Sequence, residues 1–581
     1  MMDIGAQFDL WRTNLYFDNE IRQELEDLDF NEDEIYDRFY RDLEFGTAGL
    51  RGVMGAGTNR MNRYVVRRVS AAIADMINDL DDPKAAKRGV VISYDTRNNS
   101  FEFAKEAAAA FAGRGINTKI FENTAPVPVL SYTIIKEHFQ AGIMITASHN
   151  PKEYNGYKVY WSDGAQISPE MAEEVTERIN DIEDFTKVVR FDFDFMLRHG
   201  KIAYVPKTVA QSYCRKVAEL CVDRDIIAEH GSELAIVYTP LHGSGAFWAP
   251  DILRNLGFRK LSTVKEQMRA DGNFPTVPVP NPESRAAYDM AIKVAEDKKA
   301  DVIIATDPDA DRMGACIRGE DGEFFTLTGN QIGSLMLNYI IESRKRKNLM
   351  PEKPFAVSTI VSTDLAPQIA AANDVEFLQV LTGFKFIGEQ VTLKEAKGQK
   401  FILGFEESYG YLADSYARDK DGIAAAVMFA EMALYYRVVE KRSIPEVLEE
   451  IYRKYGYFYE MQFSLALAGE AGLAKMQELM ERLREIKGGI IDEKILSIMD
   501  VAAGTEENFE TGEVTEIKLP RSNVLKYKLA NGWFAVRPSG TEPKVKIYFG
   551  FKDNESMQKA CEAAERVKAK VVAAAKAIIL E

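Results

Sequence analysis

Cysteine and histidine are scarce in this chain, with four and five residues respectively among 581. The cysteines, at positions 214, 221, 316 and 561, form no CxxC pair, and the histidines form no zinc-like cluster. A disulfide framework and a zinc site are therefore excluded. Reduced cysteines are typical of the cytoplasm, where we expect the protein to reside.

The chain also lacks positive net charge, since its formal charge is -16. A nucleic acid or an anionic membrane needs broad neutralisation of its phosphates, so neither is an expected partner. A small phosphorylated substrate remains compatible with this charge. Such a substrate requires local positive charge from a metal ion and a few Lys or Arg side chains.

Long apolar runs are missing as well. The nearest candidate, residues 423–436, is interrupted by Glu431, and the N-terminal residues show no basic segment followed by an apolar one. We expect neither a membrane-spanning helix nor a signal peptide.

Three stretches of the chain share one layout, in which a β-branched apolar run precedes a second one that leads into a polar loop. Short buried strands separated by helical segments, here 101–114 and 284–298, predict α/β domains with mixed, largely parallel sheets. Ligands bind at the carboxyl ends of such strands. The first runs are 89–93, 234–238 and 355–361, and the second runs are 142–146, 302–306 and 401–405.

The C-terminal part has a different pattern. Strands at 525–530 and 533–536 flank Asn531-Gly532, a type I′ hairpin signal, and a third strand follows at 545–551. Asn554 is the expected N-cap of a helix that runs to Leu580. The fold class is thus three similar α/β domains plus an α+β domain, divided at 1–207, 208–323, 324–449 and 450–581.

The first polar loop, Thr146-Ala147-Ser148-His149-Asn150-Pro151, places a serine just after a strand. A serine there is exposed to a substrate and suits a nucleophile. An ordinary turn serine is the alternative, because Ser, Asn and Pro favour turns. No G-x-S-x-G elbow surrounds Ser148, which disfavours a hydrolase triad.

The second loop carries Asp307, Asp309 and Asp311 directly after a strand. Three adjacent carboxylates repel one another unless a hard cation such as Mg²⁺ or Ca²⁺ compensates them. An EF-hand loop is excluded, because it needs Gly where Arg312 stands and Glu where Arg318 stands. A solvated acidic turn is the simpler alternative.

Two further loops suit sugar and phosphate. Residues 404–410 supply acidic and hydroxyl groups for sugar hydroxyls, and residues 537–541 combine Arg, Ser, Gly and Thr, which suit a phosphate cradle. A plain turn would explain either loop alone. The Gly-rich segment 45–52 matches neither the Walker A nor the dinucleotide pattern.

The sequence motifs TASHNP, DPDADR, GFEES and RPSGTEPK, one in each expected domain, resemble the motifs of the α-D-phosphohexomutase superfamily. FGTAGLRG, TPLHGSG, LTGFKFIG and GFEESYGY are similar to its phosphoglucomutase branch, namely the phosphoglucomutase-2-like and bacterial α-phosphoglucomutase enzymes. The resemblance covers nearly the whole chain. It implies four domains around a central cleft.

The resemblance also implies roles for particular residues. Ser148 would be the phosphorylated nucleophile and, as phosphoserine, a ligand of Mg²⁺ together with Asp307, Asp309 and Asp311. Catalytic roles would fall to Lys158, Arg51 and His149. Substrate would be bound by Arg312, Lys385, Glu406, Ser408, Arg537, Ser539, Gly540 and Thr541.

The implied function is the interconversion of glucose 1-phosphate and glucose 6-phosphate through glucose 1,6-bisphosphate, with small hexose phosphates as partners and neither nucleic acid nor membrane among them. A phosphopentomutase or a sugar-1,6-bisphosphate synthase of the same family shares these motifs. A metal-dependent phosphatase with a seryl-phosphate intermediate and a non-catalytic sugar-phosphate sensor are more distant alternatives.

Overall fold

The computed structural model describes residues 3–29, 31–46, 49–319, 321–466, 469–538 and 544–580. Packing divides the chain into two compact units. The first comprises Met1–Leu327, Val391–Leu393 and Ser408–Val439, and the second comprises Thr328–Gln390, Lys394–Glu407 and Glu440–Glu581. We describe each unit by itself.

The first unit begins with a six-stranded mixed sheet of order β1-β5-β4-β2-β3-β6. The predicted apolar runs form β2 and β4, which pair in parallel, and β4 in turn pairs antiparallel with β5. All five residues of β2 and of β4 are buried, because helices cover both faces of a sheet of this kind. The strands are β1 (Leu50–Val53), β2 (Val90–Tyr94), β3 (Thr118–Ile120), β4 (Ala141–Ile145), β5 (Tyr154–Trp161) and β6 (Ile202–Tyr204).

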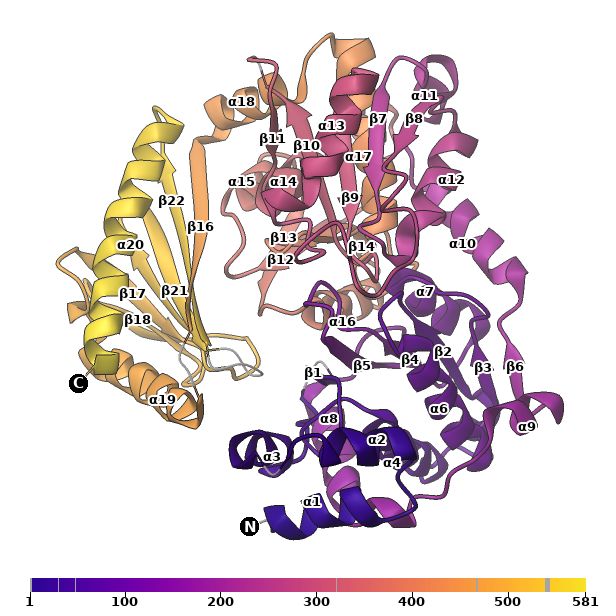
Figure 1. The fold of residues 1–581 in the computed structure, drawn as a ribbon. Coiled ribbons are helices and arrows are strands. Elements are labelled where there is room, and N and C mark those ends of the chain that lie inside the picture. The colour runs from indigo at the N-terminus through magenta and orange to yellow at the C-terminus, as the bar shows by residue number, and fades with distance from the viewer. Residues whose placement is uncertain are drawn as a thin grey trace. The chain divides into compact units, whose positions relative to one another are not determined.

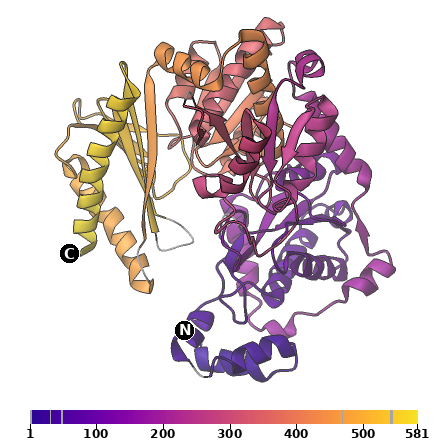
Figure 2. The ribbon, with the colours of Figure 1, turned by 45° about the horizontal axis from the view of Figure 1, so that its top comes forward.

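Helices of this unit pack on the sheet through apolar faces. The predicted helix at 101–114 is α6, which contacts both α4 and the sheet. At the N-terminus, Trp11 of α1 stacks on Phe17, with ring centroids 4.3 Å apart, and meets Phe39 of α3 edge-on at 6.0 Å, so α1–α3 form one group (Figure 2). The helices are α1 (Ile4–Thr13), α2 (Asn19–Glu26), α3 (Glu32–Phe39), α4 (Arg63–Asn78), α5 (Ala85–Arg88), α6 (Ser100–Gly113), α7 (Val127–Glu137), α8 (Pro169–Asn180) and α9 (Phe193–Arg198).

A second sheet of the first unit has the order β11-β10-β9-β7-β8. Its predicted runs form β7 and β9, which are parallel, while β10 returns antiparallel to β9. The predicted helix at 284–298 is divided into a 3₁₀ turn at Arg285–Tyr288 and α13. The elements are α10 (Lys207–Glu219), α11 (Arg224–His230), β7 (Ala235–Thr239), α12 (Trp248–Leu256), β8 (Lys260–Thr263), α13 (Asp289–Lys298), β9 (Val302–Thr306), β10 (Met313–Arg318), β11 (Phe324–Thr326) and α17 (Gly422–Tyr435). The first unit also contains β15 (Gly410–Leu412), which is not a strand of this sheet.

The apolar run at residues 423–436 corresponds to helix α17. Together with the turn after it, Gly422–Glu440, it is long and apolar enough to cross a membrane, yet 89% of that window is buried inside the protein. Glu431, which interrupts the run, accepts a hydrogen bond from the Asp223 N–H. The helix therefore serves as a core helix of the first unit, packed against α10, α11 and α12.

The second unit contains a third sheet, in which β12 pairs in parallel with β13 on one side and with β14 on the other. The two predicted runs are β12 and β14. Helix α14 starts at a capping box, where Thr328 and Gln331 satisfy each other's backbone N–H. The elements are α14 (Gly329–Arg346), β12 (Pro354–Thr359), α15 (Leu365–Ala371), β13 (Glu376–Val380), α16 (Phe384–Glu395), β14 (Lys400–Glu406) and α18 (Ile444–Tyr455).

The C-terminal sheet is antiparallel throughout and has the order β16-β22-β21-β20-β17-β18-β19. Helices α19 and α20 pack on one of its faces over an apolar core, and α20 follows β22 along its length (Figure 1). The α+β prediction is confirmed. The elements are β16 (Tyr457–Ala466), α19 (Gly469–Ile486), β17 (Ile495–Asp500), β18 (Thr505–Asn508), β19 (Val514–Glu516), β20 (Leu525–Leu529), β21 (Gly532–Pro538), β22 (Lys544–Asp553) and α20 (Met557–Leu580).

Two local predictions in this part are wrong. The hairpin turn is formed by Ala530-Asn531, since Leu529 pairs with Gly532, and neither turn residue has the positive φ of a type I′ turn. Gly532 is instead required inside the sheet, because a Cβ there would lie 2.3 Å from the Gly550 carbonyl oxygen. The N-cap of α20 is Ser556, whose Oγ accepts from the Lys559 N–H, and not Asn554.

The other face of the C-terminal sheet packs on the loops that follow β12 and β13. Trp533 Nε1 donates to Asp364 Oδ2 over 2.9 Å, and Lys526 Nζ donates to the Ile360 carbonyl over 2.7 Å. A cavity of about 580 Å³ lies beside these contacts and is lined in part by Glu460 of β16. This interface fixes how the C-terminal sheet meets the third parallel sheet inside the second unit.

Glu460 makes this interface sensitive to pH. Burial, reinforced by Asp364 and opposed by hydrogen bonds from Thr363 and Asn330, raises the pKa of Glu460 to about 7. Between about pH 4.5 and pH 7, the Glu460 carboxyl therefore keeps its proton in the folded chain but has lost it in the unfolded chain, where its pKa is near 4.5. The stability contributed by Glu460 is therefore present below about pH 4.5 and lost as the pH rises through about 7. Tyr452 of α18 also faces this carboxyl, and Lys526, Lys528, Lys552 and Glu506 line the same cavity.

We expect Glu460→Gln to be more stable than the unsubstituted protein at pH 8, by about 1–2 kcal/mol after discounting for the partial exposure of the side chain. At pH 4.5 the two proteins should differ little, because the carboxyl is then mostly neutral. Thermal unfolding midpoints at both pH values provide the measurement. Glu516→Gln on the exposed strand β19 is the matched control. A pH-independent difference between Glu460→Gln and the parent would contradict this account.

Candidate active site

Ser148 lies in the turn after β4, in a left-handed conformation with φ of 52°. The Thr146 hydroxyl accepts from the Ser148 N–H over 2.8 Å, and this bond holds the turn. The Ser148 side chain points to the second predicted loop, where its Oγ donates to Asp307 Oδ2 over 2.8 Å. The structure thus brings together two residues 159 positions apart that the sequence could place only in separate loops.

Arg97 holds the serine loop in place and was missed in the sequence. Its guanidinium is fully buried and donates to the carbonyl oxygens of Ser148 and Asn150, and to that of Pro151 over 2.8 Å. Asp95 Oδ2 lies 3.4 Å from Arg97 Nε and accepts a hydrogen bond from the Thr146 hydroxyl over 2.7 Å. The signal was present, because Asp95-Thr96-Arg97 follows β2, the strand next to β4 in the sheet.

The aspartate loop joins β9 to β10 and is held by neighbouring elements. The Val127 N–H at the start of α7 donates to the Asp309 carbonyl over 3.0 Å, and the Gly422 N–H at the start of α17 donates to the Ala310 carbonyl over 3.1 Å. At Gly422 a Cβ would lie 2.5 Å from the Arg312 carbonyl oxygen, so only glycine allows this approach. The loop is therefore fixed by packing, with Ala310 in the left-handed region at φ of 52°.

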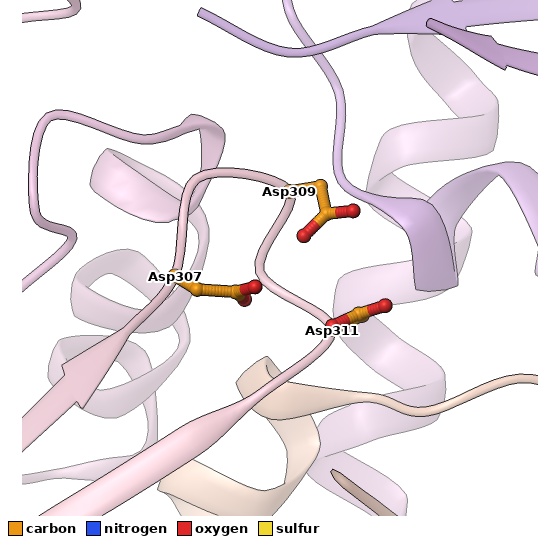
Figure 3. A group of neighbouring side chains, drawn as sticks. All are labelled: Asp307, Asp309 and Asp311. Carbon is orange, nitrogen blue, oxygen red and sulfur yellow. The ribbon is translucent and has the colours of Figure 1, made fainter. Parts of the chain in front are cut away.

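The three carboxylates have the chemistry of a hard-cation site. One oxygen from each of Asp307, Asp309 and Asp311 lies within 4.8 Å of the others, and all three side chains are buried (Figure 3). Among the described residues, Asp309 Oδ1 and Asp311 Oδ1 are buried without a hydrogen-bond partner. Buried carboxylate oxygens left without partners are costly, and a divalent ion such as Mg²⁺ would satisfy them. The residues present fit that ion.

Two lysines partly compensate the carboxylates. Lys158 Nζ lies 2.9 Å from Asp309 Oδ2 and 3.3 Å from Asp311 Oδ2, and Lys420 Nζ lies 3.2 Å from Asp311 Oδ2. Lys420 was missed in the sequence, although it stands in a charged run, Asp419-Lys420-Asp421. Both lysines reach the loop from elements far from it in the chain, β5 and the segment before α17.

The pKa values of these groups follow from burial and charge. Burial, together with the two neighbouring carboxylates, raises the pKa of Asp307 well above its usual value. Burial would also raise the pKa of Asp311, but Lys420 and Lys158 hold it below its usual range. Burial would lower the pKa of Lys158, yet Asp309 and Asp311 hold it above its usual value. Burial and mutual repulsion thus favour the neutral form of Asp307, whereas the two lysines favour the charged form of Asp311.

Three other predicted residues lie around the serine and aspartate loops. His149 Nδ1 is 3.2 Å from Ser148 Oγ, and Arg51 of β1 has its Nη1 3.5 Å from Asn150 Oδ1. Arg312 donates its backbone N–H to Asp307 Oδ1 over 3.0 Å, while its Nη1 lies 2.7 Å from Glu283 Oε1. All these groups belong to the first unit.

The sugar-loop residues are divided between the units. Glu406 ends β14 in the second unit, is buried, and accepts from the Gly383 N–H over 2.8 Å. This bond brings the turn that carries Lys385, at the start of α16, next to Glu406. Ser408, two residues further on, belongs to the first unit.

Arg537 stands near the end of β21, opposite Lys546 of β22, and its side chain hydrogen-bonds the Tyr548 hydroxyl. Ser539, Gly540 and Thr541, the other predicted residues of the phosphate loop, lie outside the described residues.

Comparisons with known proteins match this arrangement along the chain. Models of the phosphoglucomutase/phosphomannomutase α/β/α domains I, II and III match residues 42–185, 211–320 and 328–455, and the model of the C-terminal domain matches 475–567. A phosphoglucomutase of Staphylococcus saprophyticus is 37% identical over 512 residues, which cover 87% of this chain and 90% of that protein.

Two solved structures share the fold. Parafusin from Paramecium, a phosphoglucomutase in an open form, is 18% identical with a TM-score of 0.69, over 92% of this chain and 95% of that one. N-acetylphosphoglucosamine mutase from Aspergillus fumigatus, in complex with GlcNAc-6P and magnesium, is 14% identical with a TM-score of 0.50, over 96% and 100% of the two chains.

Three α/β/α domains followed by an antiparallel C-terminal domain define an enzyme of the α-D-phosphohexomutase superfamily. The chain belongs to the phosphoglucomutase/phosphomannomutase family.

Proposed function

We propose that this protein is a cytoplasmic phosphoglucomutase that interconverts glucose 1-phosphate and glucose 6-phosphate. The observation that carries the proposal is the 2.8 Å contact between Ser148 Oγ and Asp307 Oδ2, at the edge of the three-carboxylate cluster. A serine that faces a cation site from this distance is suited to carry a phosphoryl group. Phosphoglucomutase relatives at 35–37% identity support glucose as the sugar.

The reaction consists of two phosphoryl transfers. In the first, a free hydroxyl of the sugar monophosphate attacks phosphoserine 148, the new O–P bond forms as the Ser148 Oγ–P bond breaks, and the hydroxyl proton passes to a basic group. The glucose 1,6-bisphosphate then reorients so that its other phosphate faces Ser148. In the second transfer, that phosphate passes to Ser148 Oγ, and its bond to the sugar oxygen breaks. Both steps depend on alignment and charge neutralisation, and the buried lysines supply part of both.

Mg²⁺, held by Asp307, Asp309, Asp311 and a phosphoserine oxygen, would neutralise charge on the transferred phosphoryl group. Arg97 keeps the Ser148 backbone fixed, so the nucleophile does not have to be reoriented at each transfer. We assign proton transfer to Lys158 and Arg51, with His149 beside the nucleophile, because the charge of a bound Mg²⁺ would offset the carboxylates that raise the Lys158 pKa. We assign a phosphoryl contact to Arg312.

The remaining assignments concern the sugar. Glu406 and Ser408 would bind hydroxyls, Lys385 would help to select between the two orientations, and Arg537, Ser539, Gly540 and Thr541 would bind the phosphate that is not transferred. The same phosphate loop must serve both orientations. We place the domain limits at 1–207, 208–323, 324–449 and 450–581.

Substrate assays distinguish this proposal from its alternatives. Coupled assays with glucose 1-phosphate, mannose 1-phosphate and ribose 1-phosphate should show the highest kcat/KM for glucose 1-phosphate. A preference for ribose 1-phosphate would indicate a phosphopentomutase, and net formation of sugar bisphosphate would indicate a synthase. Release of inorganic phosphate at the turnover rate would identify a phosphatase.

Arg537→Lys should mainly raise KM for both monophosphates, with a smaller fall in kcat, and cost about 1.5–3 kcal/mol. Lysine cannot reproduce a bidentate contact with phosphate, and this phosphate is held in ground and transition states alike. Steady-state kinetics in both directions measure the effect. Arg484→Lys is a matched control, because Arg484 pairs with Asp500 and Asn523 in the same part of the chain. An unchanged KM in both directions would exclude Arg537 from phosphate binding.

A further inference from the structure

The turn from Pro240 to Gly245, in the TPLHGSG segment after β7, has no part in the roles assigned above. Two consecutive residues in it, Leu241 and His242, have left-handed backbones with φ of 48° and 66°. Neither is glycine, so each conformation is unfavourable by itself and persists only where surrounding contacts enforce it. Strain of this kind indicates that the shape of the turn is needed.

Several hydrogen bonds enforce that shape. The His242 N–H donates to the Gln267 carbonyl over 2.9 Å. The His242 ring lies between two oxygens, with Nδ1 2.9 Å from the Arg269 carbonyl and Nε2 2.9 Å from Thr276 Oγ1. The His242 side chain is buried, and its hydrogen-bond partners lie outside the turn, so these bonds hold the backbone of the turn in place.

The shape of the turn serves the aspartate loop. The Ser244 N–H and the Ser244 Oγ both donate to the Pro308 carbonyl oxygen, each over 2.8 Å. Pro308 stands between Asp307 and Asp309. A carbonyl that receives two donors from one residue is fixed in direction as well as position, and the peptide that follows it, which carries Asp309, is fixed with it.

Gly243 allows this close approach. A Cβ on Gly243 would lie 2.5 Å from Pro308 Cα and 2.8 Å from the Pro308 carbonyl oxygen. Its φ of −87° is accessible to any residue, so the absence of a side chain matters for contact with the loop and not for backbone freedom. A side chain here would displace the peptide that joins two of the three carboxylates.

We propose that Ser244 and Gly243 are positioning residues for the cation site: they clamp the Pro308 peptide and so set the spacing of the Asp307 and Asp309 carboxylates. Ionic coordination is sensitive to the placement of its ligands, and Mg²⁺ requires near-octahedral geometry. Loss of the clamp weakens binding of the ion without removing a ligand. This inference rests on the proposed assignment of the loop to a divalent cation.

Direct binding of metal tests the inference apart from activity. Mn²⁺ binding followed by electron paramagnetic resonance, and Mg²⁺ competition against it, give the affinity of the full-length protein. We expect Ser244→Ala to bind about 5- to 10-fold more weakly, since one of two donors to the carbonyl is lost, and Gly243→Ala to lose more than about tenfold. Thr133→Ala is the control, because its buried hydroxyl donates to a backbone carbonyl inside α7.

A second readout separates positioning from a general structural role. In the assay for glucose 1-phosphate, both variants should need more Mg²⁺ for half-maximal rate while their sugar KM at saturating Mg²⁺ stays within about twofold of the parent. A parent protein that binds no Mn²⁺ or Mg²⁺ would refute the cation assignment itself. If the parent binds the ion and either folded variant binds it equally well, the positioning role is overturned; if one variant fails to fold, the other decides.

Discussion

Ser148→Ala should abolish mutase turnover, with a fall in kcat of at least about four orders of magnitude. The alanine variant has no oxygen to carry the phosphoryl group, and the remaining charged groups have nothing to transfer. Intact-mass analysis after incubation with glucose 1,6-bisphosphate should find one phosphate on the parent protein and none on the variant.

The structure also predicts that the loss is chemical. The loop around Ser148 is held by hydrogen bonds from the Arg97 guanidinium to backbone carbonyls and by the hydrogen bond from the Ser148 N–H to the Thr146 hydroxyl. None of these bonds uses the Ser148 side chain. The variant should therefore keep the thermal unfolding midpoint of the parent. Ser168→Ala, at the N-cap of α8, is a control that removes a hydroxyl outside the site. Turnover by Ser148→Ala close to that of the parent would refute the phosphoserine mechanism.

Asp309→Ala should lower kcat by about three orders of magnitude, and chelation of divalent ions from the parent should do the same. Asp309 contributes one buried oxygen without a partner and one that accepts from Lys158, so its removal takes away a ligand and releases a lysine. Addition of Mg²⁺ should restore the chelated parent but not the variant.

A matched acidic residue outside the site completes that experiment. Asp301 precedes β9 and accepts from the Ala235 N–H and from Arg437, so Asp301→Ala removes a carboxylate from the start of the same strand. Its Mg²⁺ requirement should equal that of the parent. Full activity of the parent after chelation would refute the assignment of this loop to a cation.

Much of the fold could be predicted because local pattern and burial agree. The six apolar runs became β2, β4, β7, β9, β12 and β14, since a strand covered on both faces must be apolar throughout. The failures were local. The turn lies at Ala530-Asn531 because Gly532 is required inside the sheet, and α20 begins after Ser556, two residues beyond the expected N-cap.

The site was only partly predictable. Ser148 and the three aspartates stand out in the sequence because each motif is contiguous and follows a strand. Arg97 and Lys420 stand in short charged runs, but such a run does not by itself indicate that a buried arginine binds backbone carbonyls or that a lysine reaches the loop from a distant segment.

The sequence by itself thus determined the number and kind of domains and the position of Ser148 and of the three aspartates directly after strands, since these depend on residue type and periodicity along the chain. Only the tertiary structure decided that Ser148 faces Asp307, that Arg97 holds the serine loop and that Ser244 clamps Pro308. The physical reason is that hydrogen bonds and ion pairs act over about 3 Å, and only the packing of the strands and helices brings residues so far apart in the chain to that distance.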